Sequence, residues 1–168
     1  MASSGIGAVS HIAGELFKMM AGVDLVHVPY RGAGPAVIDL VAGQVQMMID
    51  PIASSIAHVK AGRLRALAVS SAARWDMLPD IPAVAEFVPG YEAIGLAGVM
   101  APGNTPVEIV EKLNREINAG LENPAMKARF AELGVLVLPG SPDDFGKLFA
   151  QEIEKWGKVV KFSGAKAE

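Results

Sequence analysis

The sequence contains no cysteine, few aromatic residues and no long apolar run. With no cysteine among 168 residues, disulfide bonds, thiolate metal sites and cysteine nucleophiles are excluded. Although 51% of the residues are hydrophobic, no stretch of about 18 consecutive apolar residues occurs, so no transmembrane helix is predicted. The first residues lack the basic region and apolar stretch of a signal peptide, so the chain as written does not indicate export.

Clusters of basic residues are also absent. The chain has 15 Lys and Arg against 18 Asp and Glu, a net charge of −3, and the basic residues are scattered. Aromatic residues make up only 6% and do not alternate with basic ones, so binding to nucleic acid is disfavoured. The dominance of Ala, Val, Ile, Leu and Gly is typical of an α/β protein whose parallel strands are buried on both faces.

The first 70 residues alternate between helical and strand patterns. The periodicity predicts helices over 8–21, 35–42 and 52–60, and strands over 25–28, 45–49 and 64–70. A further strand just before Ser3 would complete the alternation. Such a pattern predicts a parallel sheet with right-handed crossovers.

The second half of the chain is richer in helix. Prolines interrupt a connector over 75–89, where a short helix is expected around 83–87. The remaining predictions are strands over 93–101 and 135–138, and helices over 106–121, 124–133 and from 141 onward. Thr105 is the expected N-cap of the helix over 106–121. Two isolated strands cannot cover three amphipathic helices. We therefore expect an α/β lobe over 1–90 and an incomplete unit over 91–168.

The first candidate site opens the first predicted helix. Its small residues would let a ligand approach the backbone, and the helix N-terminus favours a carboxylate or a phosphate. Ser3 and Ser4 add hydroxyl groups. An ordinary glycine-rich helix start explains the segment equally well, and it lacks the third glycine of a dinucleotide fingerprint. The residues concerned are Ser3, Ser4, Gly5, Gly7 and Ala8.

A second turn, over residues 30–36, lies at the next strand-to-helix junction. Carboxyl ends of parallel strands form the edge at which open α/β sheets bind ligands, so the two turns are expected to lie together. Arg31 is interpreted as a solvated surface residue. Asp50 follows the next strand, where it could accept a hydrogen bond from a ligand or cap the helix that begins at Ile52.

No catalytic or metal constellation stands out. His11 and Glu15 are four residues apart on a helix, but no third ligand accompanies them. We interpret His11 as a packing or capping partner, His58 as exposed and Glu15 as solvated. No Gly-x-Ser-x-Gly elbow occurs. The sequence therefore predicts no catalytic residue, no metal and no cofactor.

Several motifs together resemble one family along essentially the whole chain. The motifs are His11-x-Ala13-Gly14-Glu15-Leu16-Phe17, Val26-His27-Val28-Pro29-Tyr30-Arg31-Gly32-x-x-Pro35-Ala36, Asp39-Leu40-x-x-Gly43-x-Val45, Gly62-Arg63-Leu64-Arg65-Ala66-Leu67-Ala68-Val69, Leu78-Pro79-Asp80-Ile81-Pro82-x-x-Ala85-Glu86, Ala101-Pro102-x-x-Thr105-Pro106 and Glu152-x-x-x-Trp156. In these motifs the chain is similar to the Bug family, the TctC-like extracytoplasmic solute receptors of tripartite tricarboxylate transporters.

The resemblance implies a periplasmic-binding-protein-like fold of the type II, Venus-flytrap kind, without enzymatic activity. Such receptors capture small carboxylates between strand–turn–helix loops and feed the membrane components of a tripartite transporter. The implied ligand-binding residues are Ser3, Ser4, Gly5, Gly7, Ala8, Tyr30, Gly32, Ala33, Gly34, Pro35, Ala36 and Asp50. Family members commonly carry Ser or Thr at the position of Ala8 and often Trp near Leu96, so one hydroxyl contact is expected to be missing here.

The resemblance begins partway into the family pattern. It implies that 1–90 form the second, ligand-binding lobe of a receptor and that 91–168 form the C-terminal part of the first lobe. Periplasmic localisation follows from the resemblance, and a cytoplasmic one if this chain is the complete gene product. Ligand affinity is expected to be weak unless another chain supplies the missing half. Apolar stripes on the helices of 106–162 predict a homo-oligomer.

Two other functions remain open at this point. One is an interaction or structural module that derives from such a receptor and binds no ligand. The other is an α/β enzyme that acts on a carboxylate or a phosphate.

Overall fold

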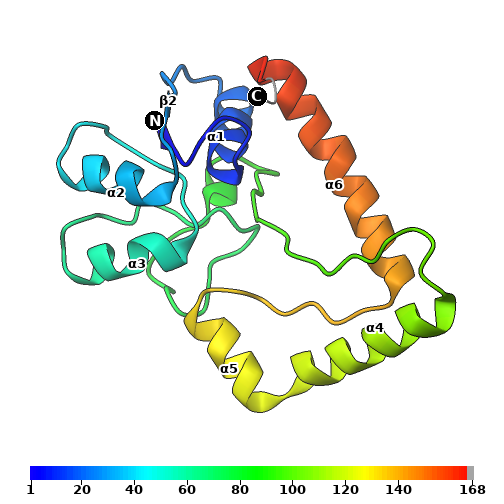
Figure 1. Ribbon diagram of the computed structural model, residues 1–168. Coiled ribbons are helices and arrows are strands. Elements are labelled where there is room, and N and C mark those ends of the chain that lie inside the picture. Colours follow the sequence, from blue (N-terminus) through cyan, green and yellow to red (C-terminus); the bar gives the residue numbers. More distant parts are fainter. Residues whose placement is uncertain (166–168) are drawn as a thin grey trace. The chain divides into compact units, whose positions relative to one another are not determined.

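A computed structural model describes residues 1–165 of the chain (Figure 1). These residues form two compact units. The first consists of Met1–Gly95 together with the end of the last helix from Lys155, and the second is Leu96–Glu154.

The first unit is built on a small parallel sheet. Strand β1 (Ala2–Ser3) pairs with β2 (Val28–Pro29), with Ala2 opposite Val28 and Ser3 opposite Pro29. Ala2 also forms a parallel bridge with Met48, so β1 lies between the other two segments. The strand expected before Ser3 and the parallel pairing are confirmed, and the fold is α/β as predicted.

The strands are much shorter than the sequence predicts. Of the predicted strand 45–49 only the bridge at Met48 forms, and of 64–70 only a parallel bridge from Val69 to Ala83. The apolar runs 93–101 and 135–138 form no strand. An apolar run becomes a strand only where a neighbouring segment offers the partner groups for a ladder. Pro29, which has no N–H, also limits the ladder at β2.

The helices of the first unit follow the predictions more closely. They are α1 (Val9–Ala21), α2 (Ala33–Val41), α3 (Ile52–Lys60) and the short 3₁₀ helix η1 (Val84–Glu86). Gly22 ends α1 in the left-handed conformation, with its N–H bonded to the Lys18 carbonyl. α2 begins two residues before Pro35 because Gly32, at φ 111°, turns the chain into the helix earlier.

Two groups of apolar side chains hold the first unit together. One packs α1 against the segment after η1 and against the end of α6 (Pro142–Ser163), where Val159 is 1% exposed. Its buried members are Ala13, Leu16, Tyr91, Ala93 and Val159. The other, made of Ala2, Ala36 and Val45, lies under the sheet edge that carries the two turns. The C-terminal helix therefore completes the core of the unit that begins the chain.

The second unit contains α4 (Val107–Glu122), α5 (Pro124–Glu132) and the beginning of α6. Asn123 caps α5 through hydrogen bonds from the N–H groups of Ala125 and Met126. α4 begins one residue later than predicted, with Pro106 rather than Thr105 as its N-cap, because Pro106 is extended at ψ 141°. None of residues 96–154 is buried, so this unit lacks a core of its own.

Apolar side chains remain exposed on the second unit. The large ones between 107 and 138 are Val107, Ile109, Leu113, Met126, Leu133, Val135, Leu136 and Leu138. Such a surface is typical of a segment that packs against further protein. Among the described residues, no helix has both the length and the apolar character needed to cross a bilayer. The assignment of the two units to receptor lobes stays a prediction.

Candidate ligand site at the sheet edge

Three segments of the first unit end at the same edge of the parallel sheet. β1 runs into the first turn (residues 3–8), β2 runs into the second turn (residues 30–36), and the segment at Met48 leads to Asp50. Backbone bonds join the two turns, from Tyr30 N–H to the Ser3 carbonyl (3.0 Å) and from Gly32 N–H to the Ser4 carbonyl (3.1 Å). The structure thus brings together the segments that the sequence singles out.

Hydroxyl groups organise the first turn. Ser3 Oγ lies 3.2 Å from the Gly5 carbonyl oxygen and accepts the Gly5 N–H at 3.3 Å. The Ser4 N–H donates to Ser10 Oγ at 2.9 Å, and the hydroxyls of Ser4 and Ser10 share a 2.8 Å hydrogen bond. Ser3 is fully buried. The two serines therefore shape the turn, and Ser3 does so from beneath it.

Both helices at this edge begin without a side-chain cap. The N-cap residues are Ala8 for α1 and Gly32 for α2, and neither offers a side-chain acceptor to the first helical turn. Water or a ligand must then satisfy the remaining N–H groups of the helix start. Two such N-termini at one edge favour an anion through their partial positive charge. Small residues line both helix starts, so an anion could approach the backbone closely.

A side-chain hydrogen bond of Tyr30 attaches the second turn to α2. The Tyr30 hydroxyl donates a 2.8 Å hydrogen bond to Asp39 Oδ2 in α2, and this bond raises the pKa of the phenol. Ala36 is fully buried in α2, so it supports the turn and does not face a ligand. Gly34 and Pro35 lie in the first turn of α2, and a Cβ on Gly34 would meet nothing within 4 Å. The accessible part of this turn is therefore its backbone around Gly34.

Asp50 keeps an unpaired acceptor at the same edge. Its Oδ2 accepts the hydroxyl of Ser54 on α3, while its Oδ1 is buried and has no partner. Pro51, not Asp50, is the N-cap of α3. Burial raises the pKa of this carboxyl, although the nearby hydroxyl groups of Ser54 and Ser55 lower it in part. An unpaired buried oxygen destabilises the fold until a donor reaches it.

Two histidines support the first turn from behind. His11 in α1 accepts the Gly7 N–H at its Nδ1 (3.0 Å), and its ring stacks on His27 with centroids 3.8 Å apart. His27 Nε2 lies 2.6 Å from Ser3 Oγ. Sequence reasoning identified His11 as a packing or capping partner but missed the stack. The one local signal is the placement of His11 four residues after Gly7, in the first turn of α1.

Two further expectations for individual side chains are wrong. Glu15 was expected to be solvated but is 4% exposed, because the face of α1 that carries it is covered and Lys18 pairs with it at 3.0 Å. His58 was expected to be exposed but is half-buried, and its Nδ1 is buried without a partner. No group of three or more potential metal ligands occurs among residues 1–165.

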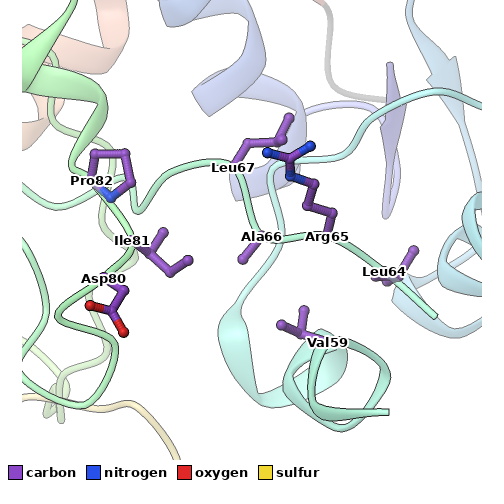
Figure 2. Close-up of a pocket in the computed structure, with 8 residues that line it drawn as sticks. All are labelled: Val59, Leu64, Arg65, Ala66, Leu67, Asp80, Ile81 and Pro82. Carbon is purple, nitrogen blue, oxygen red and sulfur yellow. The ribbon is translucent and has the colours of Figure 1, made fainter. Parts of the chain in front are cut away.

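A separate hollow of about 550 Å³ lies elsewhere in the first unit, lined by Val59 of α3 and by the segments 64–67 and 80–82. Figure 2 shows these two segments facing each other across the hollow, with Val59 below them. Arg65 and Asp80 are its only charged lining residues. None of the predicted ligand-binding residues lines it, so it is distinct from the sheet-edge site.

The first unit is thus an α/β fold whose sheet edge carries two helix starts without a side-chain cap. The model of the tripartite tricarboxylate transporter family receptor, TctC, matches residues 1–165, and the chain belongs to this family. The family description is that of a receptor. For the family, the expectation of a binding protein rather than an enzyme is therefore confirmed.

Curated relatives support the same family. A UPF0065 protein from the tcbD-tcbE intergenic region of Pseudomonas sp. strain P51 is 44% identical over 95% of this chain and 48% of its own length. Protein BugT of Bordetella pertussis is 37% identical over 98% of this chain and 51% of its own length. The chain thus spans about half the length of these relatives. A UPF0065 protein from the clcB-clcD intergenic region of Pseudomonas knackmussii, 37% identical, is matched over 94% of both chains.

Solved structures share the fold. A protein of R. palustris in a structure with adipate has a TM-score of 0.87 and 39% identity, over 98% of this chain and 55% of its own. MatC from Rhodopseudomonas palustris with bound malate has a TM-score of 0.74 and 31% identity, over 95% of this chain and 55% of its own. The predicted α/β fold of the periplasmic-binding-protein type is therefore confirmed.

Proposed function

We propose that this chain forms the ligand-binding lobe of an extracytoplasmic receptor for a small dicarboxylate. The observation that carries the proposal is the junction of the two turns, where Tyr30 and Gly32 donate backbone hydrogen bonds to Ser3 and Ser4. We infer that this junction, which joins the turns leading into α1 and α2, lets the N-termini of both helices bind one carboxylate group. Similar proteins are described with adipate and with malate.

Twelve residues form the proposed site, with distinct roles. Ala33 and Gly34 direct the backbone N–H groups of the first turn of α2 at the carboxylate. Gly5, Gly7, Gly32 and Pro35 let it approach the backbone closely, while Ser3, Ser4, Ala8, Tyr30 and Ala36 shape the two turns. The unpaired Oδ1 of Asp50 accepts a hydroxyl or ammonium group of the ligand. The membrane components of a tripartite transporter are the proposed downstream partners, and the periplasm is the proposed location.

Titration calorimetry with adipate and with malate tests the site directly. Gly34→Asp places a carboxylate in the first turn of α2, where helix geometry tolerates it but an anionic ligand is repelled. Gly34→Asn has nearly the same size without the charge. We expect Gly34→Asp to weaken binding at least about tenfold and Gly34→Asn to weaken it much less. Equal affinities of the two variants would contradict a carboxylate at this edge.

A ligand-free module is the second candidate, and one observation favours it. None of residues 96–154 is buried, as expected if this part of the chain needs a further partner. In that case no carboxylate raises the melting temperature of the chain. The melting temperature of Ala8→Ser, which restores the hydroxyl typical of the family, then does not respond to carboxylates either.

Self-association through the apolar side chains of α4, α5 and α6 would cover this surface. Light scattering measures it directly, because the average mass should rise with concentration. A single monomeric species at high concentration would exclude a second copy as the partner.

A further inference from the structure

The imidazoles of His11 and His27 form a stacked pair directly behind the first turn. The ring planes are 8° from parallel, and the centroids are 3.8 Å apart. His11 is 5% exposed. Each ring reaches a different part of the turn, His11 through Gly7 and His27 through Ser3. The pair therefore restrains the turn at both of its ends.

The hydrogen bond at Gly7 fixes the protonation state of His11. A backbone N–H can only donate, so Nδ1 of His11 must be an unprotonated acceptor. The proton of the neutral ring then lies on Nε2, which points toward Glu15 Oε1 at 3.8 Å. A proton on Nδ1 would face the Gly7 N–H and break this bond.

Three charged groups face the stacked pair. They are Glu15 and Lys18, both on α1, and the amino group of Met1 at the start of β1. Burial is the main cause that lowers the pKa of His11, with Lys18 acting in the same direction and Glu15 opposing it. Burial also lowers the pKa of His27, followed by the proximity of His11. Both rings are therefore held in the neutral form near neutral pH.

We propose that His11 is a positioning residue, which keeps the first turn in its ligand-binding shape only while its Nδ1 is unprotonated. This inference rests on the proposed function, since it assumes that the turn binds the ligand. His11 itself is buried behind the turn and acts through Gly7, whose N–H it orients. Acidification protonates His11, frees Gly7 and weakens ligand binding.

NMR spectroscopy of the ligand-free chain tests the restraint without any substitution. The ¹⁵N shifts of the His11 ring should show a protonated Nε2 and a bare Nδ1 at pH 8. The Gly7 amide signal should move with the midpoint of the His11 titration, which lies below the ordinary value of 6.5. A Gly7 signal that does not follow His11, or a proton on Nδ1 at pH 8, would overturn the proposal.

Two substitutions then separate positioning from mere packing. His11→Asn places a non-titrating acceptor near the position of Nδ1, whereas His11→Phe keeps a ring on His27 but offers no acceptor. We expect His11→Asn to bind adipate within about threefold of the parent at pH 7.5, with a flatter affinity profile from pH 6 to 8, and His11→Phe to bind about tenfold more weakly. Equal losses in both variants would show a packing role and overturn the proposal.

The two proposals fail in distinguishable ways. If neither the parent nor any variant binds adipate or malate, the proposed function is wrong, while the NMR titration still decides whether His11 orients Gly7. If the ligands bind but Gly7 does not respond to His11, only the positioning role is wrong.

Discussion

The hydroxyl of Tyr91 donates a 3.0 Å hydrogen bond to the backbone carbonyl of Ala13, 78 residues earlier in the chain. Tyr91 is fully buried, and its ring meets Phe17 edge-on with centroids 6.0 Å apart. Burial raises the pKa of the phenol to about 12. This contact fixes the middle of α1, the helix whose N-terminus contributes to the proposed ligand site.

Removal of this hydroxyl should measure the strength of that contact. We expect Tyr91→Phe to lower the free energy of unfolding by about 1 kcal/mol, the usual effect of one buried hydrogen bond. Urea denaturation followed by circular dichroism measures the change. Tyr30→Phe is a matched control, because its hydroxyl bonds to Asp39 at a position that is only partly buried, and it should cause a smaller loss. A larger loss for Tyr30→Phe would contradict the role of Tyr91.

An N-cap hydroxyl should stabilise α1. Ala8 has the extended conformation of an N-cap, at φ −65° and ψ 157°, but offers no side-chain acceptor. We expect Ala8→Ser to raise the free energy of unfolding by about 1 kcal/mol, since the hydroxyl can accept an N–H of the first turn. Ala8→Val, which adds no acceptor and is as poor an N-cap as alanine, should give no gain. Thermal denaturation of the three proteins compares them, and equal melting temperatures would refute this prediction.

The charge on Asp50 should cost stability at neutral pH. Because folding raises the pKa of this carboxyl above 3.8, the native state holds the proton more tightly than the unfolded chain does. Stability therefore falls as the pH rises from 3.8 through the native pKa and stays reduced above it. We expect Asp50→Asn to raise the melting temperature slightly at pH 7 and to bring no gain near pH 3.5.

The exposed residue Asp24 provides the control, since Asp24→Asn should leave the melting temperature unchanged at both values of pH. The same Asp50→Asn variant should lose affinity for any ligand that presents a donor to Oδ1. A melting temperature of Asp50→Asn below that of the parent at pH 7 would show that the ionised carboxylate stabilises the fold.

The strength of the ion pair between Arg74 and Glu86 should depend on the planar shape of the guanidinium group. Two 2.8 Å bonds join the side chains, and the Ala83 N–H donates to the same carboxylate, which lowers the pKa of Glu86 to about 2. Lysine cannot form this two-point contact. In Arg74→Lys we therefore expect the pKa of Glu86 to rise toward 4.5.

Carboxyl NMR titration measures that shift. Since folding depresses the pKa of Glu86, its contribution to stability is present above pH 4.5 and is lost as the pH falls toward 2. This acid-dependent part should be smaller in Arg74→Lys. An unchanged Glu86 titration in the variant would mean that the Ala83 N–H alone sets the pKa.

Gly98 should tolerate no side chain without a shift of Phe145. A Cβ at Gly98 would overlap the ring of Phe145, whereas a Cβ at Gly103 would meet nothing within 4 Å. We expect Gly98→Ala to destabilise the second unit by about 1–2 kcal/mol and Gly103→Ala to have little effect. Hydrogen exchange of the α6 amides near Phe145 compares the two. Equal protection in both variants would show that the ring moves aside without cost.

Helices could be predicted where nearby residues in the sequence begin and end them. α3 matches its prediction because Pro51 and Gly62 bracket it, and α5 because Asn123 and Pro124 start it. Strands could not be predicted in this way, because an apolar run such as 64–70 forms a strand only if another segment pairs with it. In that run only Val69 pairs, through its bridge to Ala83. Local sequence specifies caps and breaks, while pairing depends on the tertiary fold.

The candidate site also has a part that the sequence predicts and a part that it does not. The two turns were predictable because glycine and serine residues follow the ends of apolar runs, and parallel strands place such turns at one edge. The stack of His11 on His27 and the burial of Glu15 were not, since each depends on contacts between segments that local patterns do not reveal.

If backbone groups at the sheet edge bind the ligand, side chains there can be substituted without loss of the binding groups. A main-chain amide is unchanged when the side chain beside it is substituted, so anion recognition survives most replacements that keep the local torsions. Gly5, Gly7 and Gly32 are exceptions, because their positive φ angles disfavour other residues. A library randomised at Ile6, Arg31 and Ala33 should therefore yield receptors of altered selectivity more often than inactive ones.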